Sequence, residues 1–400
     1  MWSVRFLFKI AGKEKKMKTC LVGVNASYSH SSLSVRCLKK AAEVTVKEFT
    51  INDSAEKVIE SICETEAELF AFSCYIWNIE FICKVASAIK EIFPESLILF
   101  GGAEVSFDPK ETLLKYPFVD MVLSGEGEIS FKKLVSGEDY NNISGLAYRK
   151  GEEIILNEAE LISDLDSLPR LYTKADLDEL KGKIIYYETS RGCPYNCSFC
   201  LSSTTRGVRF FSLARVFSDL KLFSDCGVKL VKFVDRTFNI DEERTNKILS
   251  FILEHTGETL FHFEISAHSL KESTIELLKS APKGKIQLEI GIQSTNEKTI
   301  REINRTTDFE KVRKNVLALA ENKNIHIHLD LIAGLPYEDL QSFKKSFDDV
   351  FFLKPDMLQL GFLKMLKGAK IRKNADEHLY RFLPYPPYEV VSNKYMSYKD

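Results

Sequence analysis

The chain has 400 residues, of which 44% are hydrophobic and 28% charged, an ordinary balance for a globular protein. This length is more than one hydrophobic core normally supports, so we expect two domains. The formal net charge of −2 argues against nucleic acid and anionic membrane surfaces as partners. Apolar runs stay below the roughly eighteen residues that a membrane span requires.

Residues 1–16 begin with a mildly apolar stretch, which is short and has no small-residue cleavage site after it. A clean strand pattern starts at Met17, so we interpret residues 1–16 as an N-terminal extension; a weak secretory signal is the alternative. Without an export signal, the nine cysteines are expected to stay reduced in the cytoplasm. Clustered cysteines there indicate metal binding or catalysis before disulfides.

Residues 17–140 alternate strand-like runs with helix-like stretches. Stretches such as 31–43 and 79–93 place apolar residues three and four positions apart, as amphipathic helices do. The strand-like runs are rich in β-branched and apolar residues and cover 19–26, 44–51, 69–77, 96–105 and 119–128. This alternation predicts a doubly wound, flavodoxin-like parallel sheet whose ligands bind at the carboxyl ends of the strands.

The alternation breaks at residues 141–182. Residues 145–157 have the pattern of a β-hairpin that turns at Lys150 and Gly151, and residues 164–183 have the pattern of an extended linker. We therefore place the domain boundary in this segment.

Residues 183–370 resume the alternation with longer helices. Strand-like runs cover 184–190, 230–238, 261–268, 286–294, 325–335 and 357–366. Six strand–helix units predict a partial (β/α)6 barrel with its site at the carboxyl ends. Residues 371–400 are rich in proline and tyrosine, and we expect them to start a C-terminal extension that continues beyond this sequence.

Three of the nine cysteines, Cys193, Cys197 and Cys200, lie within the eight residues CPYNCSFC. At this cysteine content the spacing Cys-x3-Cys-x2-Cys is expected by chance about 0.005 times in the chain. The neighbouring arginine, glycine, proline and asparagine indicate a loop directly after a strand. Chance and buried structural cysteines are therefore poor explanations of the pattern.

Three thiols without a fourth partner point to a particular kind of metal site. A structural zinc ion takes four ligands, and no histidine lies at zinc-finger spacing nearby. A four-iron cluster held by three thiolates leaves one iron free for an exogenous ligand. The odd count therefore favours a [4Fe–4S] cluster with one open position.

The loop resembles the signature of the radical S-adenosylmethionine (radical SAM) enzymes, Cys-x3-Cys-x-aromatic-Cys after the first strand of a partial barrel, with Phe199 as the aromatic residue. The resemblance implies that the free iron chelates the methionine end of SAM. Reduction then cleaves the sulfonium, and a 5′-deoxyadenosyl radical abstracts a substrate hydrogen. It also implies oxygen sensitivity and a reductant such as flavodoxin or ferredoxin.

Further motifs follow in the order that this family shows. Asp235 in FVDRTFN resembles the second-strand residue near the SAM amino group. Glu264 in FEISAH and Gln293 in GIQS are similar to cofactor contacts on the third and fourth strands. Arg305 in EINRTTD matches the arginine that pairs with the SAM carboxylate, a role that suits its forked guanidinium. Gly334 lies in DLIAGLPYED, which resembles the fifth-strand motif whose backbone cradles the adenine.

The fifth-strand motif departs from the commonest family pattern because Asp330 stands where a glycine is frequent. Glu338 follows Gly334 by four residues, as in the subgroup with GLP-x-E. A plainer explanation is that the polar residues are solvated strand ends, that Arg305 is an exposed helix residue and that Gly334 belongs to an ordinary turn. Their shared order after the cysteine loop favours cofactor binding for the set.

Coupled to such a barrel, residues 17–140 resemble the N-terminal domain of cobalamin-dependent radical SAM enzymes. Glycines and polar residues gather after four of the strands, where a backbone can approach a flat macrocycle. The stretch DLDSLPR in the linker is also typical of this group. The resemblance implies that cobalamin contacts Asn25, Ser29, His30, Ser73, Tyr75, Gly101, Gly102, Glu104, Gly125 and Glu126.

One departure concerns the cobalt ligand. Cobalamin domains that ligate cobalt through histidine carry Asp-x-His-x-x-Gly after the first strand, whereas here Tyr28 stands two residues before His30 and no glycine follows at that spacing. We therefore expect no histidine on the lower face of cobalt. His30 then either contacts the corrin or its tail or caps a helix. A domain that has lost cobalamin is the alternative.

Five more cysteines in the first domain raise the alternative of a second cluster, as in the methylthiotransferases that act on tRNA. These are Cys20, Cys37, Cys63, Cys74 and Cys83. Cys20 falls in a predicted strand and Cys37 and Cys83 in predicted helices, and no basic RNA-binding domain follows. We expect these cysteines, and also Cys226, to be small core residues.

The predicted function is that of a cytoplasmic radical SAM enzyme with a [4Fe–4S] cluster, SAM and cobalamin. The resemblance implies methylation of an unactivated carbon in an unknown small-molecule or peptide substrate, with ring closure and oxidation as other reactions of such enzymes. Two rival functions are a tRNA-modifying radical SAM enzyme and a non-catalytic corrinoid or iron–sulfur binding protein.

Overall fold

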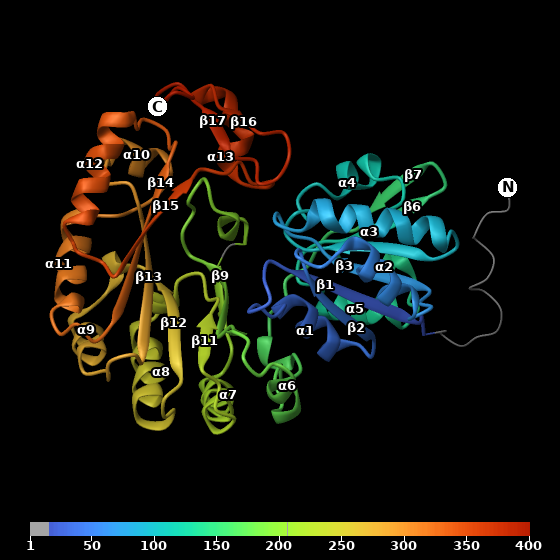
Figure 1. The fold of residues 1–400 in the computed structure, drawn as a ribbon, viewed down its shortest axis with the longest axis horizontal. Helices are drawn as coiled ribbons and strands as arrows, with labels where there is room; N and C mark the ends of the chain where they lie inside the picture. Colours follow the sequence, from blue (N-terminus) through green and yellow to red (C-terminus); the bar gives the residue numbers. More distant parts are fainter. Residues whose placement is uncertain (1–15, 206) are drawn as a thin grey trace. The chain divides into compact units, whose positions relative to one another are not determined.

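The computed structural model describes residues 16–205 and 207–400. The chain divides into two compact units, with the boundary between Leu171 and Tyr172 (Figure 1). The predicted N-terminal extension, residues 1–16, lies outside the described residues except for Lys16. None of the helices in the described ranges combines the length and the apolar character that crossing a membrane requires.

The first unit is built on a sheet of seven strands in the order β2-β1-β3-β4-β5-β6-β7. The first five strands are parallel, and β6 and β7 add to them in antiparallel fashion. The bounds are β1 Thr19–Asn25, β2 Thr45–Thr50, β3 Leu69–Ser73, β4 Leu97–Gly101, β5 Met121–Leu123, β6 Leu146–Lys150 and β7 Glu153–Leu156. The order of the parallel strands is that of a flavodoxin-like doubly wound sheet, as predicted.

Helices cover both faces of this sheet. The helices are α1 Leu33–Ala41, α2 Ala55–Cys63, α3 Ile79–Ile92, α4 Pro109–Lys115 and α5 Gly127–Val135. Residues of α2, α3 and α4 share one apolar cluster with the sheet, and residues of α1 and α5 share the other. The two clusters use alternate residues of the same strands, since successive side chains of a strand point to opposite faces.

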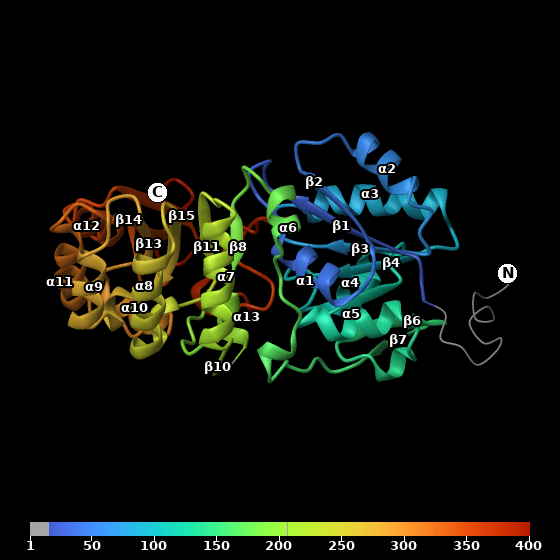
Figure 2. The ribbon, with the colours of Figure 1, turned by 90° about the horizontal axis from the view of Figure 1, so that it is seen from below.

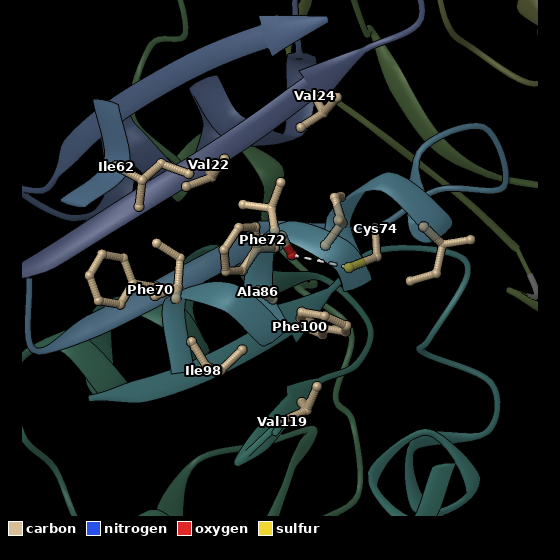
Figure 3. Close-up of a cluster of buried hydrophobic side chains, with 14 of the residues drawn as sticks. Val22, Val24, Ile62, Phe70, Phe72, Cys74, Ala86, Ile98, Phe100 and Val119 are labelled. Atoms are coloured by element: carbon tan, nitrogen blue, oxygen red, sulfur yellow. Dashed lines mark hydrogen bonds between the residues drawn. The ribbon is translucent and has the colours of Figure 1, made fainter. Parts of the chain in front are cut away.

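The cluster under α2 and α3 contains several of the cysteines. Figure 3 draws its central side chains, among them Val22, Val24, Ile62, Phe70, Phe72, Ile98 and Phe100. Cys74 is fully buried there, and its thiol donates a hydrogen bond of 3.6 Å to the carbonyl oxygen of Phe72 (Figure 3). Cys20 is buried in the same cluster, and Cys63 and Cys83 pack against it. These four cysteines are core residues, as expected.

The predicted hairpin of β6 and β7 is present, but it belongs to the sheet of the first unit rather than to a segment after it. Lys150 pairs with Glu153, so the turn is made by Gly151 and Glu152, one residue later than predicted. The expectation of a wholly extended linker at residues 164–183 is wrong, because this stretch contains helix α6 Lys174–Glu179. The Thr173 side chain accepts a hydrogen bond from the Asp176 backbone, and the Asp176 carboxylate accepts one of 2.8 Å from the Thr173 backbone. This capping box satisfies two backbone donors at the start of the helix.

The second unit is built on six parallel strands in the order β15-β14-β13-β12-β11-β8. Their bounds are β8 Ile185–Tyr187, β11 Leu230–Phe233, β12 Leu260–Ile265, β13 Ile286–Gln293, β14 His326–Ala333 and β15 Met357–Phe362. Helices gather on one side of this sheet (Figure 1 and Figure 2). They are α7 Leu213–Asp225, α8 Glu242–His255, α9 Glu272–Lys279, α10 Glu297–Glu302, α11 Phe309–Ala320 and α12 Leu340–Phe351. The predicted partial (β/α)6 barrel is confirmed.

The two faces of this sheet differ in chemistry. In β12, Phe261, Phe263 and Ile265 are buried on one face, while His262 and Glu264 belong to the other. The same alternation in β13 and β14 gives one apolar face, which helices cover, and one face with ionisable residues, which lines the inside of the barrel.

Residues 371–400 fold as part of the second unit. Helix α13 Lys370–Lys373 precedes a small antiparallel pair of strands, β16 Arg381–Phe382 and β17 Val390–Ser392. The Val390 backbone donates a hydrogen bond of 2.9 Å to Leu363, directly after β15. This C-terminal segment is therefore attached to the carboxyl end of the barrel strands.

Candidate active site

The cysteine loop leaves the barrel through a short hairpin that the sequence did not predict. Strand β9 Ser190–Cys193 pairs with β10 Gly207–Phe210 in antiparallel fashion. Gly192 has a φ of 97°, and a Cβ atom there would lie 2.0 Å from the carbonyl oxygen of Gly207. Glycine is the residue type that fits, so the hairpin sets the direction in which Cys193 enters the loop.

The three predicted ligands are free cysteines in one loop. Cys197 is buried, with Cys193 and Cys200 half-buried beside it. Burial raises the pKa of the Cys197 thiol, while the Arg305 guanidinium opposes that rise and the thiols of Cys200 and Cys193 add to it. The Cys197 thiol is therefore close to the other two thiols and to one cation.

The spacing of the sulfurs suits a cluster better than a single ion. Among the described residues, one group of three metal-ligating atoms lies within 4.8 Å of one another, and that group is Glu302, Glu377 and His378. The three sulfur atoms of the loop do not meet this limit. A tetrahedral zinc ion with Zn–S bonds of about 2.3 Å would hold its sulfurs closer together than that. This spacing argues against a single zinc ion, and three thiolates in one loop are a donor set that suits a [4Fe–4S] cluster with one open iron.

Neighbouring segments fix the cysteine loop through Ser198, which the sequence reasoning did not single out. Its backbone N–H donates a hydrogen bond of 2.9 Å to Ile303, and its carbonyl accepts one of 2.8 Å from Ile371. Tyr195 lies 2.9 Å, hydroxyl to hydroxyl, from Ser269. Backbone contacts of this kind carry no sequence signature.

Asp235 holds the entrance to the loop. Its carboxylate is 1% exposed and accepts hydrogen bonds from the Thr189 backbone at 3.0 Å, from the Thr189 hydroxyl at 2.8 Å and from the Ser190 hydroxyl. Burial raises the pKa of this carboxyl group, and those hydrogen bonds oppose the rise. Asp235 thus fixes the residues before Cys193, and its contact with the SAM amino group stays a prediction.

Arg305 and Gln293 meet at the carboxyl end of β13. Arg305 donates one hydrogen bond to the carbonyl oxygen of Gly291, and its other terminal nitrogen lies 3.9 Å from the Cys197 sulfur. Gln293 has a φ of 73°, beside an irregularity in the strand register, and its side-chain oxygen has no hydrogen-bond partner among the described residues. A Cβ atom at Gly291 would lie 2.2 Å from the Gln293 amide nitrogen. The structure thus brings three predicted site residues together.

Side chains from other segments donate hydrogen bonds to the turn after β14, the fifth strand of the barrel. Gly334 has a φ of 91°, and its carbonyl accepts hydrogen bonds of 2.9 Å each from the Tyr380 hydroxyl and the Asn393 amide. Thr299 donates to the carbonyl of Pro336 over 2.8 Å. Tyr380 and Asn393 come from the C-terminal segment, whose role here the sequence reasoning missed.

Glu338 lies entirely inside the protein behind this turn. It accepts hydrogen bonds of 2.6 Å from Ser294 and 2.9 Å from Ser346. Burial raises the pKa of its carboxyl group to about 7. Glu338 therefore joins the end of β13 to α12 through one carboxylate oxygen, while the other has no hydrogen-bond partner among the described residues.

Glu264 and Phe199 are the two remaining predicted SAM contacts. Glu264 is half-buried on the barrel's inner face, where burial and the nearby Glu289 raise the pKa of its carboxyl group. Phe199 is half-buried in the cysteine loop. Contacts of either residue with SAM stay predictions.

In the first unit, the predicted cobalamin residues collect at the carboxyl ends of the parallel strands. Asn25 ends β1, Ser73 ends β3 and Gly101 ends β4. The amide of Asn25 donates to Glu48 over 3.2 Å, and the hydroxyls of Ser73 and Ser34 lie 2.9 Å apart. This edge is where doubly wound sheets bind ligands.

The loop after β1 is fastened by Glu48. Its carboxylate accepts hydrogen bonds of 2.9 Å from the Ser32 backbone and 2.6 Å from Arg36. Ser29 and the half-buried His30 lie in the loop, and the Ser29 hydroxyl is 3.0 Å from that of Ser27. The fastened loop presents small hydroxyl residues at the sheet edge.

The loops after β3 and β4 are joined by close backbone packing. Gly102 has a φ of 106°, and a Cβ atom there would lie 2.5 Å from the carbonyl oxygen of Cys74. Glu104 is buried next to it. The Tyr75 ring stacks on Trp77, with centroids 4.5 Å apart and planes 4° apart. Trp77 is 47% exposed and was not singled out, although it stands in the same strand-end stretch as Tyr75.

Gly125 and Glu126 follow β5. Gly125 has a φ of 82°. The Glu126 carboxylate accepts a hydrogen bond of 2.8 Å from the Ile162 backbone, so one of its oxygens ties down the segment after β7. Contacts of both residues with cobalamin stay predictions.

Comparison with protein families divides the chain in the same way. Residues 187–350 match the Radical SAM superfamily, and residues 19–135 match the B12 binding domain. The first match contains the cysteine loop, Arg305 and Gly334, and the second contains the polar sheet edge.

Similar curated proteins include methyltransferases. The chain is 29% identical over 304 residues to the cobalamin-dependent radical SAM methyltransferase TokK of Streptomyces tokunonensis, which covers 70% of this chain and 44% of TokK. It is 28% identical over 303 residues to the 2-(S-pantetheinyl)-carbapenam-3-carboxylate methyltransferase of Streptantibioticus cattleyicolor, with the same 70% and 44% shares. The chain thus spans less than half the length of these two relatives.

Among solved structures, the radical S-adenosylmethionine methyltransferase TsrM of Kitasatospora setae superposes with a TM-score of 0.73. The match covers 90% of this chain and 76% of TsrM at 15% identity, so it shows the fold alone. Both family domains occur here in one chain, the B12 binding domain before the Radical SAM domain. The chain therefore belongs to the radical SAM enzymes that carry a B12-binding domain, a family whose cofactors are a [4Fe–4S] cluster, SAM and cobalamin.

Proposed function

We propose that this chain reductively cleaves SAM at a [4Fe–4S] cluster held by Cys193, Cys197 and Cys200 and methylates a carbon atom of its substrate. The observation that carries the proposal is the position of Arg305, whose guanidinium lies 3.9 Å from the Cys197 sulfur. SAM chelated through its methionine end has a carboxylate beside the cluster, and an arginine fork binds carboxylates in a bidentate manner.

When bound, the cluster and SAM supply a 5′-deoxyadenosyl radical and cobalamin supplies a methyl group. The protein's own residues bind and orient these cofactors. Arg305 takes the SAM carboxylate, and the buried side-chain oxygen of Gln293 accepts a hydrogen bond from SAM. The turn at Gly334 supports the adenine, and Asp235 keeps the cysteine loop in place.

Methylation is supported by the B12 binding domain and by the relatives, two of which are methyltransferases by name. The substrate class is a small molecule or a peptide, and the electron comes from a flavodoxin or ferredoxin. We also expect the protein to act in the cytoplasm and to lose activity in air, because exposed iron–sulfur clusters oxidise.

The test is anaerobic reconstitution of the full chain with iron and sulfide, followed by dithionite and SAM. We expect about four irons per chain, because one [4Fe–4S] cluster binds in the loop. Cys197→Ala should lose the iron, whereas Cys226→Ala, a half-buried cysteine at the end of α7, should keep it. A zinc-loaded protein, or a fully reconstituted one that forms no 5′-deoxyadenosine, contradicts the proposal.

The cobalamin half is tested separately. Hydroxocobalamin added to the full chain should give a bound corrin spectrum. After titanium(III) citrate has reduced the bound corrinoid to cob(I)alamin, SAM labelled in its methyl group should pass the label to it. Absence of corrin binding would leave only the radical half of the proposal. Co-purifying RNA would support the rival tRNA-modifying function, against which the net charge of −2 argues.

A further inference from the structure

The inner face of the barrel carries ionisable side chains where closed barrels carry packed apolar ones. Strand register places Lys232 of β11 beside His262 of β12, Glu264 beside Glu289 of β13, and Glu289 beside His328 of β14. Asp330, two residues further along β14, lies opposite Gly291. The cofactor contacts considered above use only Glu264 of this set.

Part of this set is internally paired. The Glu289 carboxylate accepts a hydrogen bond of 3.1 Å from Lys232, and it lies 2.9 Å from the ring nitrogen Nε2 of His262. These two partners lower the pKa of Glu289 to about 2 despite its burial. Lys232 therefore forms its ion pair with Glu289 and acts on Glu264 and Asp330 only from a longer distance.

Asp330 and Glu264 lack such a partner. Within the part of the chain that the structure describes, no lysine or arginine nitrogen lies within 4.0 Å of either carboxylate. The nearest basic group to Asp330 is the His328 ring, 3.1 Å away, and burial lowers the pKa of that ring, which favours its neutral form. Among the described residues, the inner face thus holds three carboxylates and one lysine, while Arg236 acts on Glu264 and Arg305 on Asp330 from beyond ion-pair distance.

Burying a carboxylate without a cation costs free energy, and among the described residues neither Oδ1 of Asp330 nor Nε2 of the buried His328 has a hydrogen-bond partner. Burial and the charges of Glu289 and Glu264 raise the pKa of Asp330 to about 7, while Lys232 and Arg305 oppose the rise. Such an uncompensated acid is costly for stability alone and is typical of a site that receives a ligand.

We propose that the Asp330 carboxylate binds a positively charged group of the substrate, a protonated amine or a guanidinium. His328 contacts Asp330, and the negative charge of Glu264 on the same inner face adds to the attraction. The proposal rests on the proposed function, since it assigns a substrate class to the same barrel. A metal ion fits less well, because no three metal-ligating atoms of this inner face, all within the described residues, lie within 4.8 Å of one another. A carboxylate instead suits a donor with several N–H groups, since both of its oxygens can accept hydrogen bonds.

The experiment measures binding of n-pentylammonium and pentylguanidinium to the reconstituted full chain by calorimetry, in phosphate buffer at pH 8. Pentanol and pentanoate are the neutral and anionic probes of equal length. Asp330→Asn keeps the shape of the side chain and removes its charge, and Glu264→Gln is the second variant. Asp225→Asn is the control, since Asp225 is exposed on α7 and forms an ion pair with Lys221, away from the barrel's inner face.

We expect at least one cation to bind tenfold or more tightly than pentanol, and Asp330→Asn to reduce that preference at least tenfold while Asp225→Asn retains it. The preference should grow as the pH rises through 7 in the wild type and stay flat in Asp330→Asn. Equal binding of cation and alcohol, or an Asp330→Asn variant with wild-type preference, overturns the proposal.

SAM is itself a cation, so its affinity is measured on the same variants. An equal loss of SAM and alkylammonium binding in Asp330→Asn would make Asp330 a SAM contact and also overturn the proposal. The proposed function fails on a different readout, namely absence of 5′-deoxyadenosine from wild-type protein, which the binding measurement does not use.

Discussion

The hydroxyl of Tyr380 donates a hydrogen bond of 2.9 Å to the carbonyl oxygen of Gly334, which links the C-terminal segment to the turn that should support the adenine of SAM. Asn393 donates to the same oxygen over 2.9 Å. The Ile371 backbone reaches Ser198 inside the cysteine loop. One segment thus holds both the turn and the loop.

Removing both donors should weaken SAM binding. A buried carbonyl that loses its partners costs about 1–3 kcal/mol, so we expect the Tyr380→Phe/Asn393→Ala variant to bind SAM roughly tenfold less tightly. Equilibrium dialysis with labelled SAM measures this. Tyr398→Phe is the control, because Tyr398 is 83% exposed. Equal SAM affinity in both variants would show that the turn keeps its shape without the segment.

Glu338 should make stability depend on pH. Its pKa is raised to about 7 in the folded protein, whereas an unfolded chain has the usual value of 4.5. Between these values the folded state holds the extra proton, so this group's contribution is full below 4.5 and is lost as the pH rises to 7, by up to about 3 kcal/mol. Asp330 titrates in the same direction and range.

The effect of Glu338 is isolated by comparing wild type with Glu338→Gln, since the amide cannot ionise. Thermal unfolding midpoints measured from pH 5 to pH 8 should fall more steeply for the wild type than for the variant. Parallel curves would mean that ionisation of Glu338 does not change the stability of the fold.

Gly192 should be essential for building the cluster site. A side chain there meets the Gly207 backbone at 2.0 Å, in addition to the strain of a φ of 97°. We expect Gly192→Ala to bind little iron on reconstitution. Gly182→Ala separates the two effects, because Gly182 has a φ of 84° with open space around it, and this variant should bind iron normally. Equal iron content in the two variants would contradict the role of the hairpin.

The stacked pair of Tyr75 and Trp77 should contribute to cobalamin binding in the first unit. The pair sits at the end of β3 with Trp77 47% exposed, and aromatic stacking is worth about 0.5–1.5 kcal/mol. Trp77→Ala should therefore bind hydroxocobalamin several-fold less tightly in an absorbance titration. Ile92→Ala, an exposed residue on α3, should bind it normally. An unchanged affinity in Trp77→Ala would remove the pair from the site.

Patterns within short stretches of sequence predicted the main architecture. The strands of both sheets, the hairpin at Gly151 and the cysteine loop are local, since each depends on residues a few positions apart. The predicted partners Gln293 and Arg305 also lie together beside Cys197, because they follow the same strand of the barrel.

Long-range contacts were missed. The attachment of Asn393 to Gly334 joins residues 59 positions apart, and that of Thr189 to Asp235 joins residues 46 apart. Neither contact leaves a periodic pattern in the sequence from which it could be predicted. Asp235 and Glu126 were predicted as ligand contacts from their place at strand ends. Their carboxylates accept hydrogen bonds from Thr189 and Ile162, and these partners could not be predicted because they come from other segments of the chain. Helix α6 was missed because a six-residue helix has too few turns for apolar periodicity to show.

The central claim is that the three-cysteine loop holds a cluster whose open iron takes SAM beside Arg305. Electron paramagnetic resonance of the anaerobically reduced full chain, with and without saturating SAM, tests it most directly. We predict a [4Fe–4S]⁺ signal in the wild type that changes when SAM is added, and no such signal in Cys197→Ala. A cluster signal that SAM leaves unchanged would contradict the account.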